Sequence, residues 1–252
     1  MRGRTVVTGA VAKLYVIPLS HPSIAARKML ERAGIDHEVV TLPSGLHPPL
    51  LRLRGFAGGT VPALEMEGGR VQGSLAIARA IAAAGPPGAL YPTDPEARRR
   101  VEEAERWGEA EIQPIPRRLF RWALVRRGDL RRRLAGINRI PLPRVAGALM
   151  KPVAMHFARV SSADDGTVRR DVERLPDLLD RVDLLIAEGT IGGEEPNAAD
   201  LQIGTSVRAM LAFEDLRGAI EGRPAEALGR RILPRFPASA PSVLPEAWRP
   251  TP

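Results

Sequence analysis

Apolar and polar residues alternate over the first third of the chain with two different periods. Short apolar runs bounded by Gly and Pro are typical of strands, whereas apolar residues three or four positions apart are typical of helices. One helix should end at Gly34, because glycine readily takes the left-handed conformation that closes many helices. The expected elements are a strand over 14–19, a helix over 22–34, a strand over 36–42, a loop over 43–59, a hairpin over 63–71 and a helix over 75–84. This order predicts an α/β unit.

Helical spacing describes most of the remaining chain. Apolar residues over 101–115 form one stripe, which Pro114 and Pro116 should kink because proline interrupts the helical hydrogen-bond ladder. The stretches 168–186 and 197–213 predict two further helices. We divide the chain into a disordered leader (1–11), an α/β domain (12–84), a Pro- and Gly-rich linker (85–97), an all-helical domain (98–236) and an extended Pro-rich tail (237–252).

Composition excludes several kinds of site. The chain has 252 residues and no cysteine, which rules out disulfides, thiolate metal sites and a thiol nucleophile of its own. His37, His47 and His156 stand without helical partners that would complete a metal site, so we expect no metal. No stretch approaches the ~20 apolar residues of a membrane span, and we expect a cytoplasmic protein.

The charge pattern does not favour a macromolecular partner. The 37 basic and 29 acidic residues give a net charge of +8, but aromatic residues make up only 4% of the chain. Nucleic-acid-binding surfaces usually combine clustered basic residues with aromatic side chains that stack on bases. We therefore expect neither nucleic acid nor membrane as a partner. Attachment of a basic surface to anionic lipid or nucleic acid is a third reading, which a steep salt dependence of binding would reveal.

Three stretches carry a resemblance to a known family. The stretch "LYVIPLSHPSIAARKMLERAGIDHEVV" (14–40) resembles the first strand, active-site turn and first helix of the glutathione transferase superfamily. "GGTVPALEMEGGRVQGSLAIARAI" (58–81) is similar to the hairpin and helix start that bind glutathione there. "EEPNAADLQIGTSVRAML" (194–211) resembles the buried helix of the family's C-terminal domain. The resemblance implies an α/β thioredoxin-like N-terminal domain followed by an all-α helical-bundle C-terminal domain.

The resemblance implies that Ser20 is the catalytic residue. Ser20 stands where a strand passes into a helix, and the unpaired N–H groups and dipole of a helix start favour an anion. A hydroxyl that donates to the thiolate of bound glutathione would lower the thiol pKa, which is ordinarily about 8.5. Ser23 is the alternative donor and a second glutathione contact. Two readings of Ser20 stay open, as thiolate donor and as plain helix N-cap.

The resemblance assigns glutathione binding to five residues of the second stretch. Val61 would pair its main chain with the tripeptide beside a cis Pro62, against the alternative of an ordinary trans proline. Ser74 and the neighbouring N–H groups would hold the γ-glutamyl carboxylate, against the alternative that Ser74 is only an N-cap. The family has an acidic residue or Gln before this serine. Here that position is Gly73, and Gln72 one place earlier is a further candidate contact.

The "NAAD" sequence has a structural interpretation. Asn197 followed by Asp200 at the third position has the spacing of a capping box at a helix start. We assign this pair to folding alone.

We therefore predict a glutathione transferase-like enzyme that adds glutathione, or a related thiol, to a hydrophobic electrophile, with no cofactor. The resemblance further implies a homodimer and a role in detoxification. The alternative is a catalytically silent binding or regulatory protein of the same fold, which Gly73 and the Arg-rich helices favour. His21 is expected at the rim of the site. One of Arg117, Arg118 and Arg121 is a candidate for the cleft that binds the electrophile, against the simpler interpretation of the arginine runs as solvated faces. The candidates for lining its apolar site are Trp107, Leu119, Phe120 and Trp122, against the more common role of such residues in the core.

Overall fold

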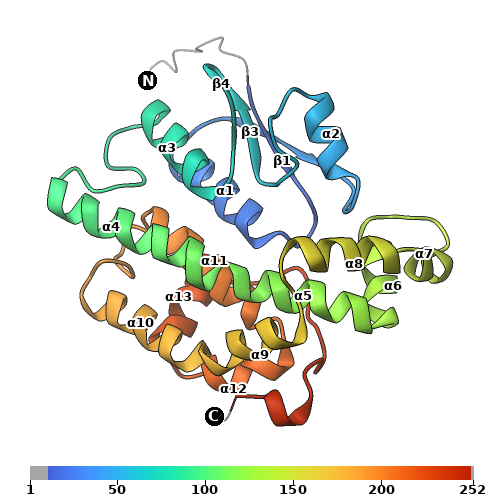
Figure 1. The fold of residues 1–252 in the computed structure, drawn as a ribbon. Coiled ribbons are helices and arrows are strands. Elements are labelled where there is room, and N and C mark those ends of the chain that lie inside the picture. Colours follow the sequence, from blue (N-terminus) through green and yellow to red (C-terminus); the bar gives the residue numbers. More distant parts are fainter. Residues whose placement is uncertain (1–10, 251–252) are drawn as a thin grey trace.

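Four strands form one mixed sheet in the first part of the chain (Figure 1). The computed structural model describes residues 11–250. The strands lie in the order β2-β1-β3-β4, with β1 parallel to β2 and antiparallel to β3, and β3 antiparallel to β4. Their bounds are Ala12–Val16 (β1), His37–Thr41 (β2), Ala63–Met66 (β3) and Gly69–Gln72 (β4). The predicted strands and hairpin are therefore confirmed.

The strand register brings three chain segments together at one end of the strands. Ala63, the first residue of β3, lies opposite both Tyr15 near the end of β1 and Gln72 at the end of β4. The segment after β1, the segment before β3 and the segment after β4 consequently meet there. These segments carry the residues that the sequence assigned to the site.

Three helices accompany the sheet. They are α1 (His21–Arg32), α2 (His47–Leu53) and α3 (Ser74–Ala84), and α1 packs against α3. The prediction of a loop over 43–59 is wrong, because α2 lies within it. The two prolines at 48 and 49 occupy the first turn of α2, where proline is tolerated because the first N–H groups of a helix have no intrahelical partner.

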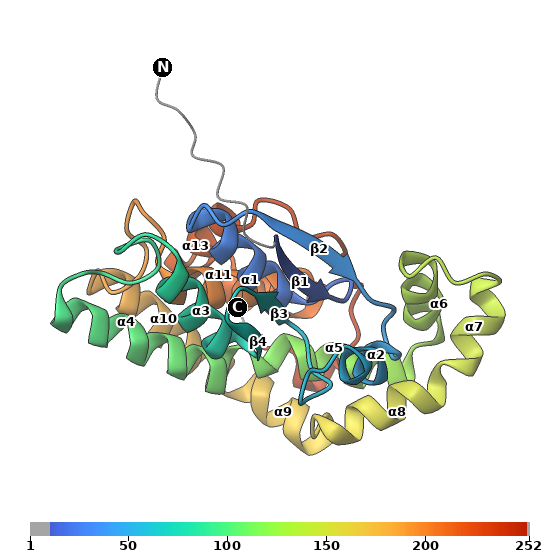
Figure 2. The ribbon, with the colours of Figure 1, turned by 90° about the horizontal axis from the view of Figure 1, so that it is seen from above.

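Helices form the rest of the chain, and α11 lies at their centre beneath α1 (Figures 1 and 2). Nearly every residue of α11 is buried, so it is enclosed on all sides by both parts of the molecule. The helices are α4 (Pro95–Trp107), α5 (Pro114–Arg126), α6 (Gly128–Ile137), α7 (Pro143–Leu149), α8 (Lys151–Val160), α9 (Asp165–Glu173), α10 (Leu175–Ala187), α11 (Ala198–Met210), α12 (Arg217–Ile220) and α13 (Pro224–Ile232).

Two prolines set helix boundaries. A π-helical turn over Gly108–Ile112 separates α4 from α5, which begins at Pro114, so the predicted interruption is confirmed. The helix expected over 168–186 is divided into α9 and α10, which is a correction. Pro176 stands in the first turn of α10 and cannot continue the hydrogen-bond ladder of α9.

The predicted capping box opens α11. Asn197 Oδ1 accepts from the N–H of Asp200 at 3.1 Å, and Asp200 Oδ2 accepts from the N–H of Asn197 at 2.9 Å. Asp200 also accepts from the N–H of Gly192 at 2.6 Å and is fully buried. The two hydrogen bonds that its carboxylate accepts both come from backbone N–H groups near the helix start, which agrees with a role in folding.

The segment predicted as an extended tail packs back onto the helices. Asp215 accepts hydrogen bonds from the N–H groups of Val243 (2.5 Å) and Leu244 (3.1 Å), and Leu244 is buried. Trp248 lies 5.9 Å from Trp122 between ring centres. The predicted leader lies outside the described residues except for Val11.

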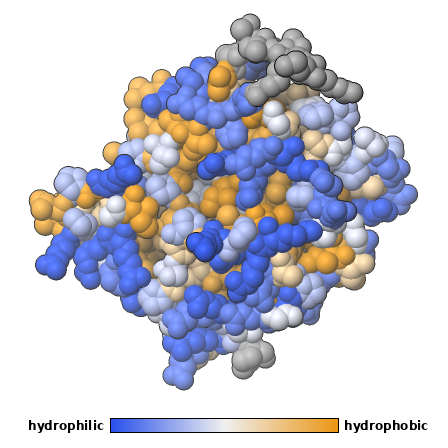
Figure 3. Space-filling view, turned by 180° about the vertical axis from the view of Figure 1, so that it is seen from behind, coloured by the Kyte–Doolittle hydropathy of each residue, from blue (hydrophilic) through white to orange (hydrophobic). Residues whose placement is uncertain are grey.

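One end of the helical part projects from the molecule. Helices α6, α7 and α8 extend to one side in Figures 1 and 2, and apolar surface is visible at the corresponding left edge of Figure 3. Exposed apolar side chains on this projection are Ile137, Leu142, Val145, Leu149, Val153, Met155 and Val160. Within residues 11–250, no helix combines the length and apolar character needed to cross a bilayer.

Candidate active site

Ser20 closes the start of α1 and keeps a free hydrogen. Its Oγ accepts from the N–H of Ser23 at 3.3 Å and from the Ser23 hydroxyl at 2.8 Å. Because the Ser23 hydroxyl donates to Ser20, the hydrogen of the Ser20 hydroxyl must find a different acceptor. No such acceptor lies within residues 11–250. The half-buried Ser20 therefore caps α1 with its oxygen and retains its O–H for a ligand.

Ser23 stands behind Ser20. Its side chain is 3% exposed, compared with a half-buried Ser20, and its hydroxyl is directed to the Ser20 oxygen. This arrangement makes Ser23 a positioning residue that orients the Ser20 hydroxyl. It offers little support for Ser23 as a direct contact of glutathione.

Val61 and Pro62 lie just before β3 and are joined by a cis peptide bond, as the resemblance implies. Pro62 is buried, and its carbonyl accepts from the N–H of Gly73 at 3.1 Å. The main chain of the half-buried Val61 makes no hydrogen bond within the described part of the chain. An extended peptide could therefore pair with both main-chain groups of Val61.

Gln72 supports the loop that leads to Val61. Its side chain donates to the carbonyls of Gly58 (3.1 Å) and Thr60 (3.0 Å) and accepts from the N–H of Gly58 (2.7 Å). All these partners belong to the protein backbone. The geometry thus favours Gln72 as a residue that fixes the loop before Val61 over Gln72 as a carboxylate ligand.

Gly73 and Ser74 open α3. Gly73 has φ +87° and ψ 153°, a backbone conformation that residues with a Cβ adopt only with strain. Ser74 is buried, and its hydroxyl donates to Gln113 Oε1 at 3.1 Å. The hydroxyl is therefore already committed, and the N–H of Leu75 is engaged by Glu109, which leaves the other first-turn N–H groups of α3 for an anion.

Gln113 ties two helix starts together and was not foreseen from the sequence. Its side chain accepts from Ser74 at the start of α3, and its carbonyl lies 3.2 Å from His21 Nε2 at the start of α1. Since a carbonyl only accepts, Nε2 carries the hydrogen. One residue of the helical part thus fixes the separation of the two predicted glutathione-binding helix starts.

His21 is buried, so its expected place at the rim is wrong. Burial, together with the positive charge of Arg117, lowers the pKa of His21 to about 3. The imidazole is consequently neutral at physiological pH. It serves as a fixed donor to Gln113 and supplies no positive charge to a bound anion.

Glu109 is a second residue that the sequence did not reveal. It lies near the start of α3, where the N–H of Leu75 and the charge of Arg117 both favour its ionised form. Burial outweighs these effects and raises the pKa of Glu109. Glu109 thus brings a carboxylate to the start of α3 from the π-helical turn, whereas position 73, directly before Ser74, is a glycine.

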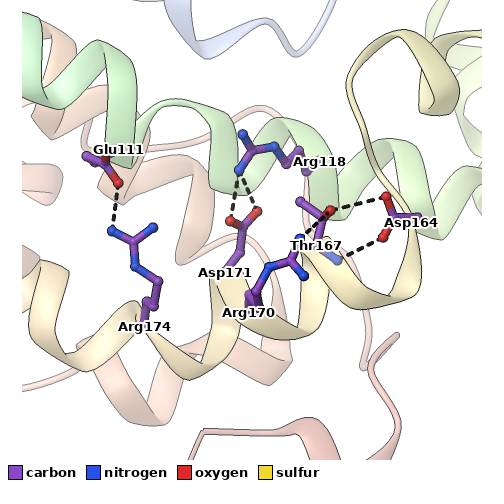
Figure 4. A network of polar contacts seen from close by, with 7 residues as sticks. All are labelled: Glu111, Arg118, Asp164, Thr167, Arg170, Asp171 and Arg174. Carbon is purple, nitrogen blue, oxygen red and sulfur yellow. Dashed lines mark hydrogen bonds and ion pairs between the residues drawn. The ribbon is translucent and has the colours of Figure 1, made fainter.

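The three candidate arginines of α5 point in two directions. Arg118 donates to both carboxylate oxygens of Asp171 on α9, at 2.8 and 3.0 Å, and belongs to a polar network between α5 and α9 (Figure 4). Arg117 and Arg121 lie one turn apart, and their charges influence the pKa values of His21 and His47 of the first domain. The first domain therefore meets Arg117 and Arg121.

The apolar candidates are mostly core. Leu119 and Trp122 are 2% and 3% exposed and belong to the main hydrophobic cluster, and Trp107 and Phe120 pack against it. Trp122 Nε1 also donates to Asp165 at 2.7 Å. The expectation that Leu119 and Trp122 line a substrate site is wrong, because neither has surface to offer a ligand.

Comparison with known proteins relates this architecture to a family. Residues 14–88 match the family model described as glutathione S-transferase, N-terminal domain. No curated protein sequence matches the chain.

The similar solved structures are glutathione transferases. Glutathione transferase F7 from Populus trichocarpa has a TM-score of 0.60 at 20% identity, over 89% of this chain and 94% of that one. Glutathione S-transferase III gives 0.59 at 23% identity, over 92% and 100% of the two chains. Glutathione S-transferase-I, bound with lactoylglutathione, gives 0.59 at 19% identity, over 90% and 95%.

The fold is that of the glutathione transferases, with a thioredoxin-like domain followed by a helical one. The family match itself covers residues 14–88, and the likeness of the rest of the chain to these proteins is one of fold.

Proposed function

We propose that this protein is a glutathione transferase-like enzyme that activates glutathione, or a related thiol, for addition to a hydrophobic electrophile. The single observation that carries the proposal is the Ser20 hydroxyl, whose hydrogen has no acceptor in the described chain other than Ser23. It stands at a helix start, where the dipole and free N–H groups favour a negative charge. This is the environment that a bound thiolate needs.

The chemistry requires only that the thiol be ionised and held. The Ser20 O–H donates to the sulfur, and the thiol proton leaves to solvent. The thiolate then attacks an electrophilic carbon, for example of chlorodinitrobenzene, so that a sulfur–carbon bond forms and chloride departs. A hydrogen bond to a charged group contributes about 1.5–3 kcal/mol, which corresponds to one to two units of thiol pKa. The reaction needs no cofactor.

The peptide part of the thiol would bind along the edge of the sheet. The unpaired main chain of Val61 would pair with the cysteinyl residue, and the start of α3 would hold the γ-glutamyl carboxylate. One similar protein has lactoylglutathione bound, which agrees with a glutathione derivative as ligand. A cytoplasmic homodimer with a detoxifying role belongs to the same proposal.

The second candidate is a catalytically silent binding protein of the same fold. The observation that favours it is the start of α3, where the Ser74 hydroxyl is committed to Gln113 and the carboxylate of Glu109 lies close by. A second carboxylate at that place would meet repulsion from Glu109.

Retention on immobilised glutathione tests the proposal and separates the two candidates. We expect the protein to be retained, to elute with free glutathione and to conjugate chlorodinitrobenzene. Retention without conjugation would favour the silent binding protein. Absence of both retention and conjugation would contradict glutathione as the thiol.

A further inference from the structure

Two arginines on one face of α5 lack an anion. Arg117 and Arg121 are both half-buried, and neither makes a salt bridge or a side-chain hydrogen bond within residues 11–250. The Nε atom of Arg117 is fully buried with no acceptor. By contrast, Arg118 between them is neutralised by Asp171. Burying two like charges side by side is costly unless something balances them.

The surroundings do not supply that balance. Burial, with a further contribution from Arg117, lowers the pKa of Arg121 to about 10. Burial likewise lowers the pKa values of His21 and His47, with further contributions from Arg117 and Arg121 respectively. Both histidines are consequently neutral at pH 7. Among residues 11–250, Glu109 is the acid whose charge favours ionised Arg117, but the two side chains form no ion pair. This wall of the site keeps an excess of positive charge.

The arginines lie beside the predicted reaction centre. Gln113 directly precedes α5, and Arg117 and Arg121 follow it at intervals of about one helical turn, or about 6 Å. Gln113 contacts His21, the neighbour of Ser20 in sequence. At the other end, the guanidinium of Arg121 lies 5.5 Å from the ring centre of Phe157, which stacks on His47 at the start of α2. Positive charge therefore extends from the Ser20 end of the site to an aromatic surface.

We propose that Arg117 and Arg121 bind an anionic group, a carboxylate or a sulfonate, on the electrophile that the thiol attacks. The proposal rests on the proposed function and names the substrate class of that site. An aromatic electrophile would place its ring by Phe157 and its anionic group on the two guanidinium groups. The carboxylates of the thiol are the other source of such an anion, but their expected contacts, Val61 and the start of α3, belong to the first domain.

A binding measurement that needs no catalysis tests this assignment. We expect calorimetry to give at least ~10-fold tighter binding for nitrobenzoate than for nitrobenzamide, which has nearly the same shape without the charge. Arg117→Gln and Arg121→Gln should each reduce that preference, and the double variant should abolish it. Arg133→Gln, which removes an exposed charge on α6, should leave the preference unchanged. Circular dichroism confirms that each variant is folded.

The results distinguish failure of the proposed anion site from failure of the proposed function. Equal binding of the two probes to the wild-type protein would overturn the proposal. So would reduced affinity for glutathione in the arginine variants with an unchanged preference for nitrobenzoate, because the arginines would then hold the thiol. An arginine-dependent preference in a protein that conjugates no electrophile would support the anion site and contradict the proposed function.

Discussion

A single serine serves both the fold and the proposed chemistry at the start of α1. The oxygen of Ser20 accepts two hydrogen bonds from Ser23 and so caps the helix, whereas its hydrogen stays available. The two readings that the sequence left open, N-cap and thiolate donor, are thus compatible. The proposed catalytic role needs only the hydroxyl hydrogen of Ser20, whereas the N-cap role needs only its oxygen.

Ser20→Gly separates the two roles. Glycine is nearly as good an N-cap as serine, to within a few tenths of a kcal/mol, but it cannot donate from a side chain. We expect the conjugation rate to fall about ten- to a hundredfold while the thermal unfolding midpoint changes little. Ser20→Thr, which keeps the hydroxyl, should retain most of the activity. An unchanged rate in Ser20→Gly would exclude Ser20 as the donor.

Gly73 is required by its backbone conformation. Its φ of +87° is unfavourable for any residue with a Cβ, although nothing lies within 4 Å of where that Cβ would stand. Gly73→Ala should therefore lower the free energy of unfolding by about 1–3 kcal/mol. The control is Gly136→Ala in α6, which has equally open space and no positive φ, and which should be neutral or stabilising. Equal effects in urea denaturation would contradict this interpretation.

The backbone conformation at position 73 explains why this chain has a glycine, and no acidic residue, directly before Ser74. Replacing it with Glu would restore the family's acidic residue but would also strain the backbone where α3 begins. Glu109, from the π-helical turn, already brings a carboxylate to this helix start. The backbone at position 73 therefore explains why a side chain is missing there, whereas the nearby Glu109 carboxylate remains the observation that favours a silent binding protein.

At the scale of elements, α3 and α4 are joined through a buried acid. Glu105 of α4 is fully buried and accepts from Arg79 of α3 at 2.7 Å and from the Tyr91 hydroxyl at 2.8 Å. Its other oxygen has no hydrogen-bond partner. Burial accordingly raises the pKa of Glu105 from 4.5 to about 7.

This shift predicts how stability depends on pH. The folded protein binds the Glu105 proton more tightly than the unfolded chain does, so the contribution is favourable at low pH and declines as pH rises from 4.5 to about 7. Glu105→Gln should flatten that decline in the unfolding free energy. Glu103→Gln on the exposed face of α4 should leave it unchanged. A decline of equal size in Glu105→Gln would show that other groups cause it.

The elements that the sequence predicted well have local causes. The hairpin follows from alternating residues around Gly68-Gly69, and α11 from the capping box at Asn197. Helix α2 escaped prediction because its two prolines suggest a loop unless the helix start is already known. The division of α9 from α10 had its signal in Pro176, which the apolar periodicity concealed.

At the scale of the whole molecule, the sequence named the segments of the site but not how they are held together. Ser20, Val61 and Ser74 were named through the resemblance of two sequence stretches, 14–40 and 58–81, to the glutathione transferase superfamily. Gln113 was not, because its contacts with His21 and Ser74 span 92 and 39 residues and carry no local pattern. The choice of Arg117 and Arg121 over Arg118 likewise depends on which face of α5 meets the first domain.

The most direct test of Ser20 as the thiolate donor is the pKa of the glutathione thiol in the complex, followed by the ultraviolet absorbance of the thiolate during a pH titration. We expect a thiol pKa about one to two units below the ordinary 8.5 in the wild-type protein, and a return toward 8.5 in Ser20→Gly with glutathione still bound. A bound thiol with an unshifted pKa in the wild-type protein, or an equal shift in Ser20→Gly, would contradict this role of Ser20.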